Sequence, residues 1–198
     1  MPRARARQLL ARYFEEPCAR LLRSLKFTPN AVTVLGLVVT GGAAYLAARG
    51  AFWPAGLVLL FAGALDMLDG ALARLTGKAS RFGAALDSFT DRAAEALLLL
   101  GLLLYYLGQD HQAGVVLVFL VMVASYLVSY LRARGEGLGI TMKETGLGTR
   151  TERVVVIIIG LLTHSAFLIL VSLAVVLALS TFTSGQRLYH LWRDTRGE

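Results

Sequence analysis

Residues 66–91 read DMLDGALARLTGKASRFGAALDSFTD, and this stretch places four aspartates inside a chain that is otherwise strongly apolar. Carboxylates are costly near hydrocarbon and persist there mainly when they are paired, hydrated or bound to metal. Asp66 and Asp69 are three residues apart, and Asp87 and Asp91 are four apart, so each pair lies on one face of a helix. The intervening residues allow one helix to end and the next to begin. The spacing therefore predicts two facing pairs of carboxylates.

The composition around this stretch is that of an integral membrane protein. Of the 198 residues, 56% are hydrophobic and only 17% are charged, and the mean hydropathy is +0.62. A soluble domain of this length would rarely be so apolar. Apolar stretches, compared with the roughly 20 residues that cross a bilayer, fall at 31–49, 53–73, 84–108, 112–133, 152–164 and 166–186. We therefore expect an all-α integral membrane protein, with six transmembrane helices forming a bundle over residues 29–192.

The last apolar run allows two interpretations. Val154 to Thr183 is almost unbroken, and at about 30 residues it is long for one spanning helix. Three consecutive polar residues, Thr163, His164 and Ser165, interrupt the run, so we divide it there into two spans. Five spans, ending in one long helix, is the alternative. No linker or repeat divides the chain, which predicts a single domain over residues 1–198.

Basic residues indicate how the chain is oriented in the membrane. They precede the first span, separate the second from the third and the fourth from the fifth, and follow the last span. Because basic loops remain in the cytoplasm, both termini are expected there. The aspartate stretch joins the second and third spans at the same boundary, so its chemistry is expected to face the cytosol.

The N-terminal residues 3–25, RARARQLLARYFEEPCARLLRSL, mix basic residues with leucines and aromatic side chains. This pattern predicts an amphipathic helix that lies on the membrane surface, bent near Pro17. The whole chain has a net charge of +7. Because its arginines flank membrane spans, we attribute this charge to orientation and to anionic lipid headgroups, and we expect no nucleic-acid partner.

The four carboxylates predict a metal site. Ionised together in a partly desolvated site they would repel one another, and two divalent cations would balance their charge. Oxygen ligands favour magnesium, manganese or calcium over zinc, so we predict two Mg²⁺ ions, with Mn²⁺ as the alternative. An alternative is that the aspartates cap helices or pair with Arg74, Arg81 and Arg92. That alternative explains one pair of aspartates more readily than two. Glu95, one turn further along, is expected to support the metal ligands or to pair with Arg92, and not to bind metal itself.

The motif D-x2-D-G-x2-A-R-x8-G-x3-D-x3-D resembles the signature of the CDP-alcohol phosphotransferases. All eight of its fixed positions are present, namely Asp66, Asp69, Gly70, Ala73, Arg74, Gly83, Asp87 and Asp91. The resemblance implies a six-helix membrane enzyme, usually a homodimer, here in the cell membrane of a prokaryote. Such an enzyme transfers a phosphatidyl or archaetidyl group from CDP-diacylglycerol or CDP-archaeol to an alcohol and releases CMP.

The resemblance also implies roles for individual residues. The four aspartates would hold two metal ions, and Asp91 would act as general base, since an alcohol is a poor nucleophile until its proton is removed. The positions that match residues contacting the CDP-lipid are Pro29, Asn30, Ala31, Val32, Gly70, Arg74 and Ser80. For Pro29 and Asn30, plain helix initiation with Asn30 as N-cap is an alternative.

The acceptor alcohol is predicted from two other cytoplasmic stretches, SYLRARGEGLG at 129–139 and GLGTRTERVVV at 146–156. Arginine binds phosphate bidentately, so their arginines favour an acceptor that carries its own phosphate. The first stretch resembles the subgroup that makes phosphatidylinositol phosphate or archaetidylinositol phosphate from inositol 1-phosphate. Matching basic residues are Arg132, Arg134 and Arg153, assisted by Lys143 or Arg150. Arg132 stands where lysine is expected, and Thr151 where proline often precedes Glu-Arg.

Three alternatives to this interpretation remain open from the sequence. In the first, the arginines serve as helix anchors that bind lipid headgroups. The same chemistry with glycerol 3-phosphate would give phosphatidylglycerol phosphate. A small cation transporter would use the aspartates as an ion pathway; against it, the carboxylates lie at one membrane face and no inverted repeat is visible.

Overall fold

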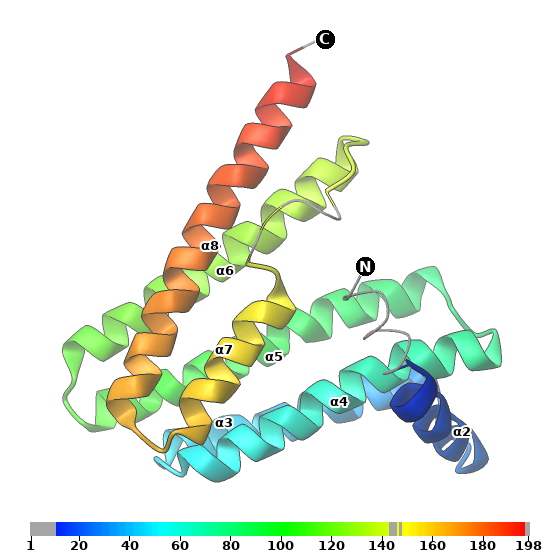
Figure 1. Ribbon diagram of the computed structural model, residues 1–198, viewed down its shortest axis with the longest axis horizontal. Helices are drawn as coiled ribbons and strands as arrows, with labels where there is room; N and C mark the ends of the chain where they lie inside the picture. The colour runs from blue at the N-terminus through cyan, green and yellow to red at the C-terminus, as the bar shows by residue number, and fades with distance from the viewer. Residues whose placement is uncertain (1–10, 143–145, 147, 197–198) are drawn as a thin grey trace. The chain divides into compact units, whose positions relative to one another are not determined.

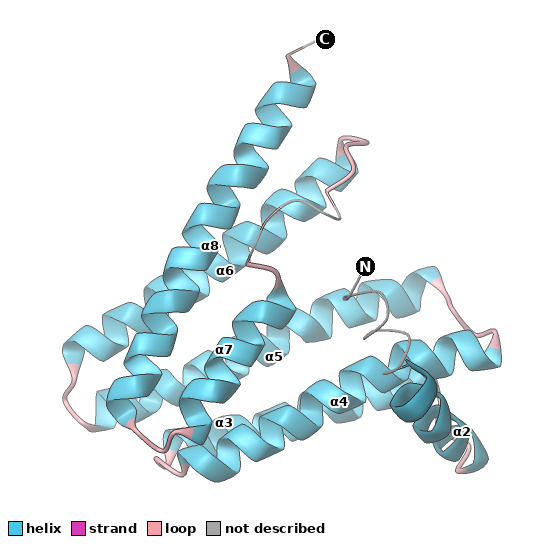
Figure 2. Cartoon of the chain, in the orientation of Figure 1, coloured by secondary structure: helices cyan, strands magenta, loops and turns pink. Residues whose placement is uncertain are grey.

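The structure, a computed structural model, describes residues 11–142, 146 and 148–196, and every regular element in this part of the chain is helical. Figures 1 and 2 show the elements. They are a π-helical turn η1 (Ala11–Glu15) and the helices α2 (Glu16–Ser24), α3 (Pro29–Ala48), α4 (Phe52–Thr76), α5 (Arg81–Gly108), α6 (Gln112–Gly137), α7 (Arg150–Leu162) and α8 (Ala166–Thr195). The predicted all-α class is confirmed.

The chain divides into two compact units, and three helices contribute to both. The first unit comprises Met1–Gly42 and Val58–Ala94, and the second comprises Ala43–Leu57 and Glu95–Glu198. The aspartate stretch falls in the first unit. The arginines predicted to bind the acceptor fall in the second.

The core of the first unit joins α2 to α3 and α4. It contains Ala19 from α2, Val32 from α3, and Leu65, Ala71 and Leu72 from α4. Burial of these apolar side chains holds α2 against the longer helices. Of the predicted N-terminal helix 3–25, residues 11–24 are helical in η1 and α2, and residues 3–10 lie outside the described part of the chain. That this helix lies on the membrane surface stays a prediction.

The second unit is built around α8, which packs against α6 and α7 (Figure 1). Its core includes Val121 of α6, Leu161 of α7 and Leu173 of α8, all fully buried. A further close approach occurs where α5 meets α3. A Cβ atom added to Gly101 would collide with the backbone carbonyl of Ala44, so only glycine allows the two helices to come this close.

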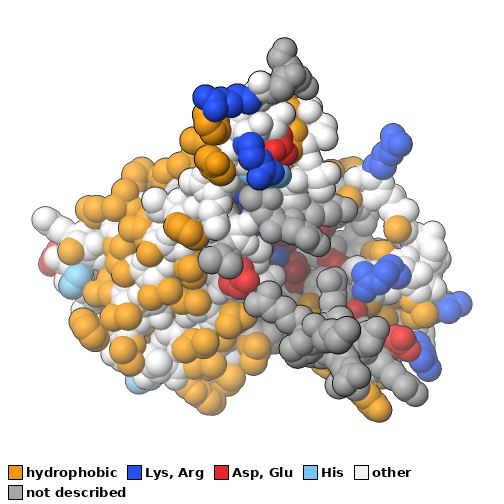
Figure 3. All heavy atoms as spheres, turned by 45° about the horizontal axis from the view of Figure 1, so that its top comes forward, with side chains coloured by type: hydrophobic (Ala, Val, Ile, Leu, Met, Phe, Trp, Pro, Cys, Tyr) orange, Lys and Arg blue, Asp and Glu red, His pale blue; other side chains and the backbone are white. Residues whose placement is uncertain are grey.

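Within the described part of the chain, four helices are long and apolar enough to cross a membrane. They are α3, α4, α6 and α8, with mean hydropathies of 1.8, 1.7, 2.3 and 2.5. Helix α5 carries several charges in its first half, and α7, with 13 residues, rises only about 20 Å against the roughly 30 Å of hydrocarbon. Figure 3 shows hydrophobic side chains over much of the face that it draws. Among the described residues, four helices thus have the length and composition of membrane spans, and six transmembrane spans stay a prediction.

The break predicted in the last apolar run is confirmed. Helix α7 ends at Leu162 and α8 begins at Ala166. Between them His164 has a positive φ of 57°, a conformation that stops a helix. The Ser165 hydroxyl then accepts a hydrogen bond from the Leu168 amide at 3.4 Å, which caps α8. The single long final helix of the alternative is not observed.

Candidate functional site

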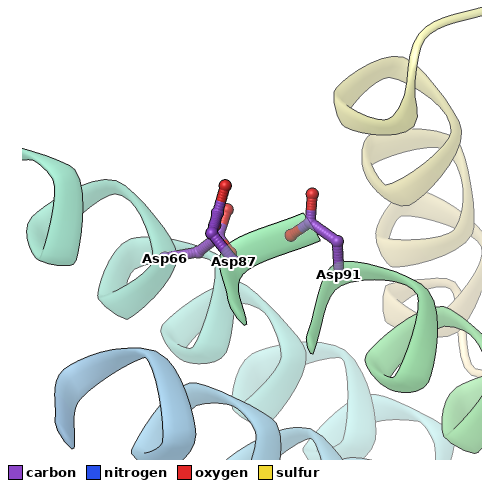
Figure 4. A group of neighbouring side chains, drawn as sticks. All are labelled: Asp66, Asp87 and Asp91. Carbon is purple, nitrogen blue, oxygen red and sulfur yellow. The ribbon is translucent and has the colours of Figure 1, made fainter. Parts of the chain in front are cut away.

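Three of the four predicted aspartates form a compact group in the first unit. Asp66 projects from α4, and Asp87 and Asp91 project from α5, toward the same side of the two helices (Figure 4). One carboxylate oxygen from each lies within 4.8 Å of those of the other two, and all three residues are half-buried. Ionised carboxylates at this separation repel by about 3 kcal/mol per pair at an effective dielectric constant of 20. An oxygen-only donor set this close fits a hard divalent cation such as Mg²⁺ or Mn²⁺.

The fourth aspartate, Asp69, is not part of this compact group, although Asp66 and Asp87 lie close enough to interact with it electrostatically. It is only 7% exposed, and one of its carboxylate oxygens accepts a hydrogen bond of 2.6 Å from the hydroxyl of Thr33 on α3. Three residues advance a helix by about 300°, so Asp69 is offset by about 60° from Asp66. This offset directs Asp69 toward α3. A role for Asp69 as a metal ligand stays a prediction.

Two of the residues predicted to contact CDP, Asn30 and Ser80, lie together near the start of α5. The amide of Gly83 donates to the Ser80 hydroxyl at 2.9 Å. A Cβ atom at Gly83 would lie 3.1 Å from that hydroxyl and 3.4 Å from the side-chain oxygen of Asn30. Asn30 and Ser80 are thus brought together around a position where a larger residue would crowd both. Of the other predicted contacts, Pro29 is half-buried and Ala31 is exposed.

One detail of this region differs from the expectations. Asn30 lies inside α3 and does not act as its N-cap; instead the Thr28 hydroxyl accepts a hydrogen bond from the Ala31 amide at 3.3 Å. The reason is that α3 already begins at Pro29, since the fixed φ of proline suits the first turn of a helix. The Val32 side chain is completely buried in the core, and its contact with the CDP-lipid stays a prediction.

Arg74 lies over Gly70 and forms an ion pair with the N-terminal segment. A Cβ atom at Gly70 would lie 3.4 Å from an Arg74 terminal nitrogen, so the two predicted CDP contacts are adjacent. The Arg74 guanidinium donates to the Glu15 carboxylate at 3.0 Å. The Arg74 side chain is 68% exposed and that of Glu15 is 13% exposed. The arginine is therefore accessible, with a carboxylate already against it.

The predicted acceptor residues occupy different environments in the second unit. Arg132 is half-exposed and pairs with Glu136 on α6 at 3.0 Å, Arg134 is exposed and Arg150 is half-buried. Arg153 is 1% exposed. Its Nε and Nη2 donate to the two carboxylate oxygens of Glu95, each at 2.9 Å. Lys143 lies outside the described residues.

Arg187 on α8 is not among the residues predicted from the sequence. It is 4% exposed and donates to the backbone carbonyl of Val128 at 2.6 Å. Arg132 and Arg153 lie close enough to interact with it electrostatically. The sequence does contain a sign of this burial. Arg187 follows Ser180 by seven residues and Thr183 by four, so it lies on the same helix face as these two buried residues. A charge on such a face usually has a function.

Comparisons with known proteins agree on the class of protein. A family model described as CDP-alcohol phosphatidyltransferase matches residues 26–183. The chain is 37% identical to archaetidylinositol phosphate synthase of Pyrococcus horikoshii, over 88% of each sequence. It is 40% identical to phosphatidylinositol phosphate synthase of Corynebacterium glutamicum, over 76% of this chain and 70% of the relative.

Solved structures give the same result. Phosphatidylinositol phosphate synthase of Mycobacterium tuberculosis with CDP-DAG bound has a TM-score of 0.82 and 30% identity, and the match covers 91% of this chain and 94% of that one. Its complex with manganese and citrate has a TM-score of 0.82, 31% identity and coverage of 90% and 89%. The chain belongs to the CDP-alcohol phosphatidyltransferase family. It is an enzyme of that class, which rules out the cation transporter considered from the sequence.

Proposed function

We propose that this enzyme transfers a phosphatidyl or archaetidyl group from a CDP-linked lipid to inositol 1-phosphate, releasing CMP. The observation that carries the proposal is the pairing of two sites in one chain. One is the close carboxylate group of Asp66, Asp87 and Asp91, and the other is a set of arginines that includes the buried Arg153 and Arg187. Relatives named for the synthesis of phosphatidylinositol phosphate and archaetidylinositol phosphate support the inositol acceptor.

In this mechanism Asp91 is the general base. Its carboxylate takes the proton from the attacking hydroxyl of inositol phosphate, and the hydroxyl oxygen forms a bond to the phosphorus that carries the lipid. The bond between that phosphorus and the CMP oxygen breaks, and CMP leaves with the bonding electrons. General bases of this kind contribute about 10²- to 10⁴-fold to the rate.

The carboxylates would hold two divalent cations, with Mg²⁺ as the physiological ion and Mn²⁺ as a substitute. Asp66, Asp87 and Asp91 lie close enough to share them, and Asp69 would join when its carboxylate turns from Thr33. Bound there, the ions would neutralise negative charge on the diphosphate as CMP departs. The manganese complex of the Mycobacterium tuberculosis relative supports this cofactor class.

The CDP-lipid would be held by the residues that surround the start of α5 and by Arg74. A guanidinium presents a planar fork that matches phosphate oxygens. Gly70 allows Arg74 to fold back along α4, while Asn30 and Ser80 offer polar groups beside Gly83. Pro29, Ala31 and Val32 would shape this site through the backbone of the first turn of α3.

The acceptor phosphate would bind to arginines from three segments of the second unit. Those from the sequence are Arg132, Arg134, Arg150 and Arg153, and Lys143 completes the predicted set. Arg187 extends it, since it lies near Arg132 and Arg153. Several guanidinium groups held together are favourable when a doubly charged phosphate lies among them.

In the membrane we propose six spans in a single domain, with α5 and α7 added to the four apolar helices. Both termini and the aspartates would face the cytoplasm of a prokaryotic cell, as the distribution of arginines favours. The helix from residue 3 to 25 would lie on the membrane surface, where Leu21 and Leu25, each 60% exposed, would enter the headgroup region.

We also propose that the enzyme is a homodimer. Helix α6 carries a groove of about 490 Å³ lined by Met122, Val123, Tyr126, Leu127 and Tyr130. Aromatic and methionine side chains are enriched where proteins associate. Disulfide crosslinking of a Leu127→Cys variant in membranes would test this, and a failure to crosslink at any position of the groove would contradict it.

The proposed reaction is tested with purified protein, CDP-diacylglycerol or CDP-archaeol, Mg²⁺ and a panel of acceptors, by measuring CMP. We expect release with inositol 1-phosphate and not with free inositol. Release with glycerol 3-phosphate alone would overturn the choice of acceptor. In Asp91→Asn the rate should fall by about 10³-fold, and an unchanged rate would remove Asp91 as the base.

A further inference from the structure

A buried chain of hydrogen bonds joins α5, the turn before α7, and α8 within the second unit. Glu95 on α5 holds the guanidinium of Arg153 through two bonds of 2.9 Å. The Nη1 atom of Arg153 donates to the carbonyl oxygen of Gly148 at 3.0 Å. The amide of Gly148 in turn donates to the hydroxyl of Thr183 on α8 at 2.8 Å. All four bonds are buried, so they are protected from competition with water.

The backbone at Gly148 is tightly enclosed, which fixes the position of the turn. A Cβ atom there would lie 2.9 Å from both the carbonyl oxygen of Leu179 and the hydroxyl of Thr183. The next residue, Thr149, donates its amide to the Glu152 carboxylate at 2.7 Å, and α7 then begins at Arg150. The start of α7, and with it Arg150, is therefore held by Gly148 and its partners.

Glu95 and Thr183 have no role in the chemistry proposed above, yet they are among the most completely buried polar residues. Glu95 is 5% exposed and Thr183 is 0% exposed, and their side chains are engaged by Arg153 and by the Gly148 amide respectively. Burying a carboxylate without a compensating partner would cost folding free energy. Here its partner, Arg153, belongs to the set of arginines proposed to bind the acceptor phosphate.

The pairing determines what Arg153 can still offer. A guanidinium has five N–H donors, and the two bonds to Glu95 and the one to Gly148 use three of them. Two N–H groups remain, one on each terminal nitrogen. The two hydrogen bonds to the Glu95 carboxylate fix the plane of the guanidinium and therefore the direction of these N–H groups. Glu95 also compensates the charge of Arg153, which would otherwise add to the repulsion among Arg132, Arg153 and Arg187.

We propose that Glu95 and Thr183 are positioning residues for the acceptor: through Arg153 and Gly148 they orient the N–H groups that receive the acceptor phosphate. This inference rests on the proposed function. It assigns the helix that carries the catalytic Asp91 a second task, because Glu95 follows Asp91 by four residues on α5. The expected effect of disturbing the chain is weaker acceptor binding with unchanged binding of the CDP-lipid.

The test is steady-state kinetics on Glu95→Gln, with each substrate varied at saturating concentration of the other. Glutamine keeps the shape of the side chain but turns an amide N–H₂ toward a guanidinium, so Arg153 must rotate. We expect KM for inositol phosphate to rise at least tenfold and KM for CDP-diacylglycerol to stay within threefold. Glu95→Asp, which retains the charge, should recover part of the loss. Equal changes in both KM values, or a change in kcat alone, would overturn the inference.

Thr183 provides an independent arm if Glu95→Gln does not fold. Thr183→Val removes the acceptor of the Gly148 amide without changing the volume, and Thr183→Ser retains it. We expect a rise in acceptor KM for valine of at least threefold and near wild-type behaviour for serine; no rise for valine in a protein with the wild-type melting temperature would contradict the proposal. Glu16→Gln, which breaks an exposed pair with Arg20, is the matched control and should change neither KM.

The two proposals fail in different ways. If the wild-type enzyme releases no CMP with inositol phosphate but does so with another phosphorylated acceptor, the choice of acceptor is wrong. The same KM comparison with that acceptor then tests the positioning role of Glu95. If the wild-type enzyme uses inositol phosphate and Glu95→Gln leaves its KM unchanged, the positioning role is wrong and the proposed reaction stands.

Discussion

The aspartate group and the arginine group solve opposite electrostatic problems in different ways. Asp66, Asp87 and Asp91 come within 4.8 Å of one another, and a divalent cation bound among them would offset the repulsion between their carboxylates. Arg153 and Arg187 are buried as deeply as core residues, and the protein itself supplies their partners, the Glu95 carboxylate and the Val128 carbonyl. The first group thus brings like charges together, whereas in the second each buried arginine has a hydrogen-bond acceptor within the protein.

The largest effect should come from removing divalent cations. Chelation with EDTA is expected to abolish CMP release, and excess Mg²⁺ or Mn²⁺ should restore it. Because a cation that binds only the folded protein stabilises it by about 2.7 kcal/mol at 100 times its Kd, the melting temperature should rise with Mg²⁺. If EDTA changed neither the activity nor the melting temperature, the aspartate group would not be a metal site.

Arg187→Met tests the arginine side. In the proposed complex the Arg187 guanidinium donates to the acceptor phosphate. Loss of a hydrogen bond from a charged donor costs about 1.5–3 kcal/mol, so KM for inositol phosphate should rise by about tenfold or more. Replacing a buried charge by an apolar side chain of similar length is often neutral or stabilising, so the melting temperature should not fall. Arg193→Met removes a charge that is 63% exposed and serves as the control. A large drop in stability with unchanged KM would make Arg187 purely structural.

The Thr33→Val variant tests whether Asp69 is stabilised by its hydrogen bond to Thr33 or by a bound cation. The hydroxyl of Thr33 donates to a buried carboxylate oxygen of Asp69, and losing such a bond costs about 1–3 kcal/mol. We expect a lower melting temperature in the absence of Mg²⁺ and a smaller deficit in its presence. Thr33→Ser keeps the hydroxyl and should resemble the wild type. A deficit unaffected by Mg²⁺ would separate Asp69 from the metal site.

The smallest effect is expected at the exposed pair between Glu15 and Arg74. Exposed ion pairs contribute less than about 1 kcal/mol, so Glu15→Gln should leave the melting temperature nearly unchanged. Because Arg74 is then no longer shared with a carboxylate, KM for CDP-diacylglycerol should fall by up to about threefold. Kinetics with varied CDP-lipid measures this change. A rise in that KM would mean that Glu15 orients Arg74 instead of competing for it.

The aspartate group could be predicted because its members are local. Asp87 and Asp91 are spaced for one helix face, and Asp66 precedes them in the same 26-residue motif. The helices were predictable for a similar reason, since apolar runs and the polar break at Thr163 to Ser165 mark their ends. The turn of Asp69 toward Thr33 could not be predicted, because it depends on which neighbouring helix lies closest to that face.

The arginine group was predictable only in part. Arg132 and Arg153 could be recognised from their short flanking sequences, but no local pattern links Glu95 to Arg153, which are 58 residues apart. Arg187 pairs with the backbone of Val128, 59 residues away, and a backbone partner leaves no trace in the side-chain sequence. Contacts across such distances follow from how the helices pack, which hydrophobic periodicity alone does not specify.

The contact between Gly101 and the carbonyl of Ala44 has a consequence for variation of this enzyme. The two helices meet backbone to backbone there, so even a single added methyl group would have to push them apart. A saturation scan of single substitutions would therefore mark Gly101 as intolerant, alongside Asp91. Intolerance to replacement thus has two sources in this protein, chemistry at one position and steric exclusion at the other, and only the second would be accompanied by loss of the folded protein from the membrane.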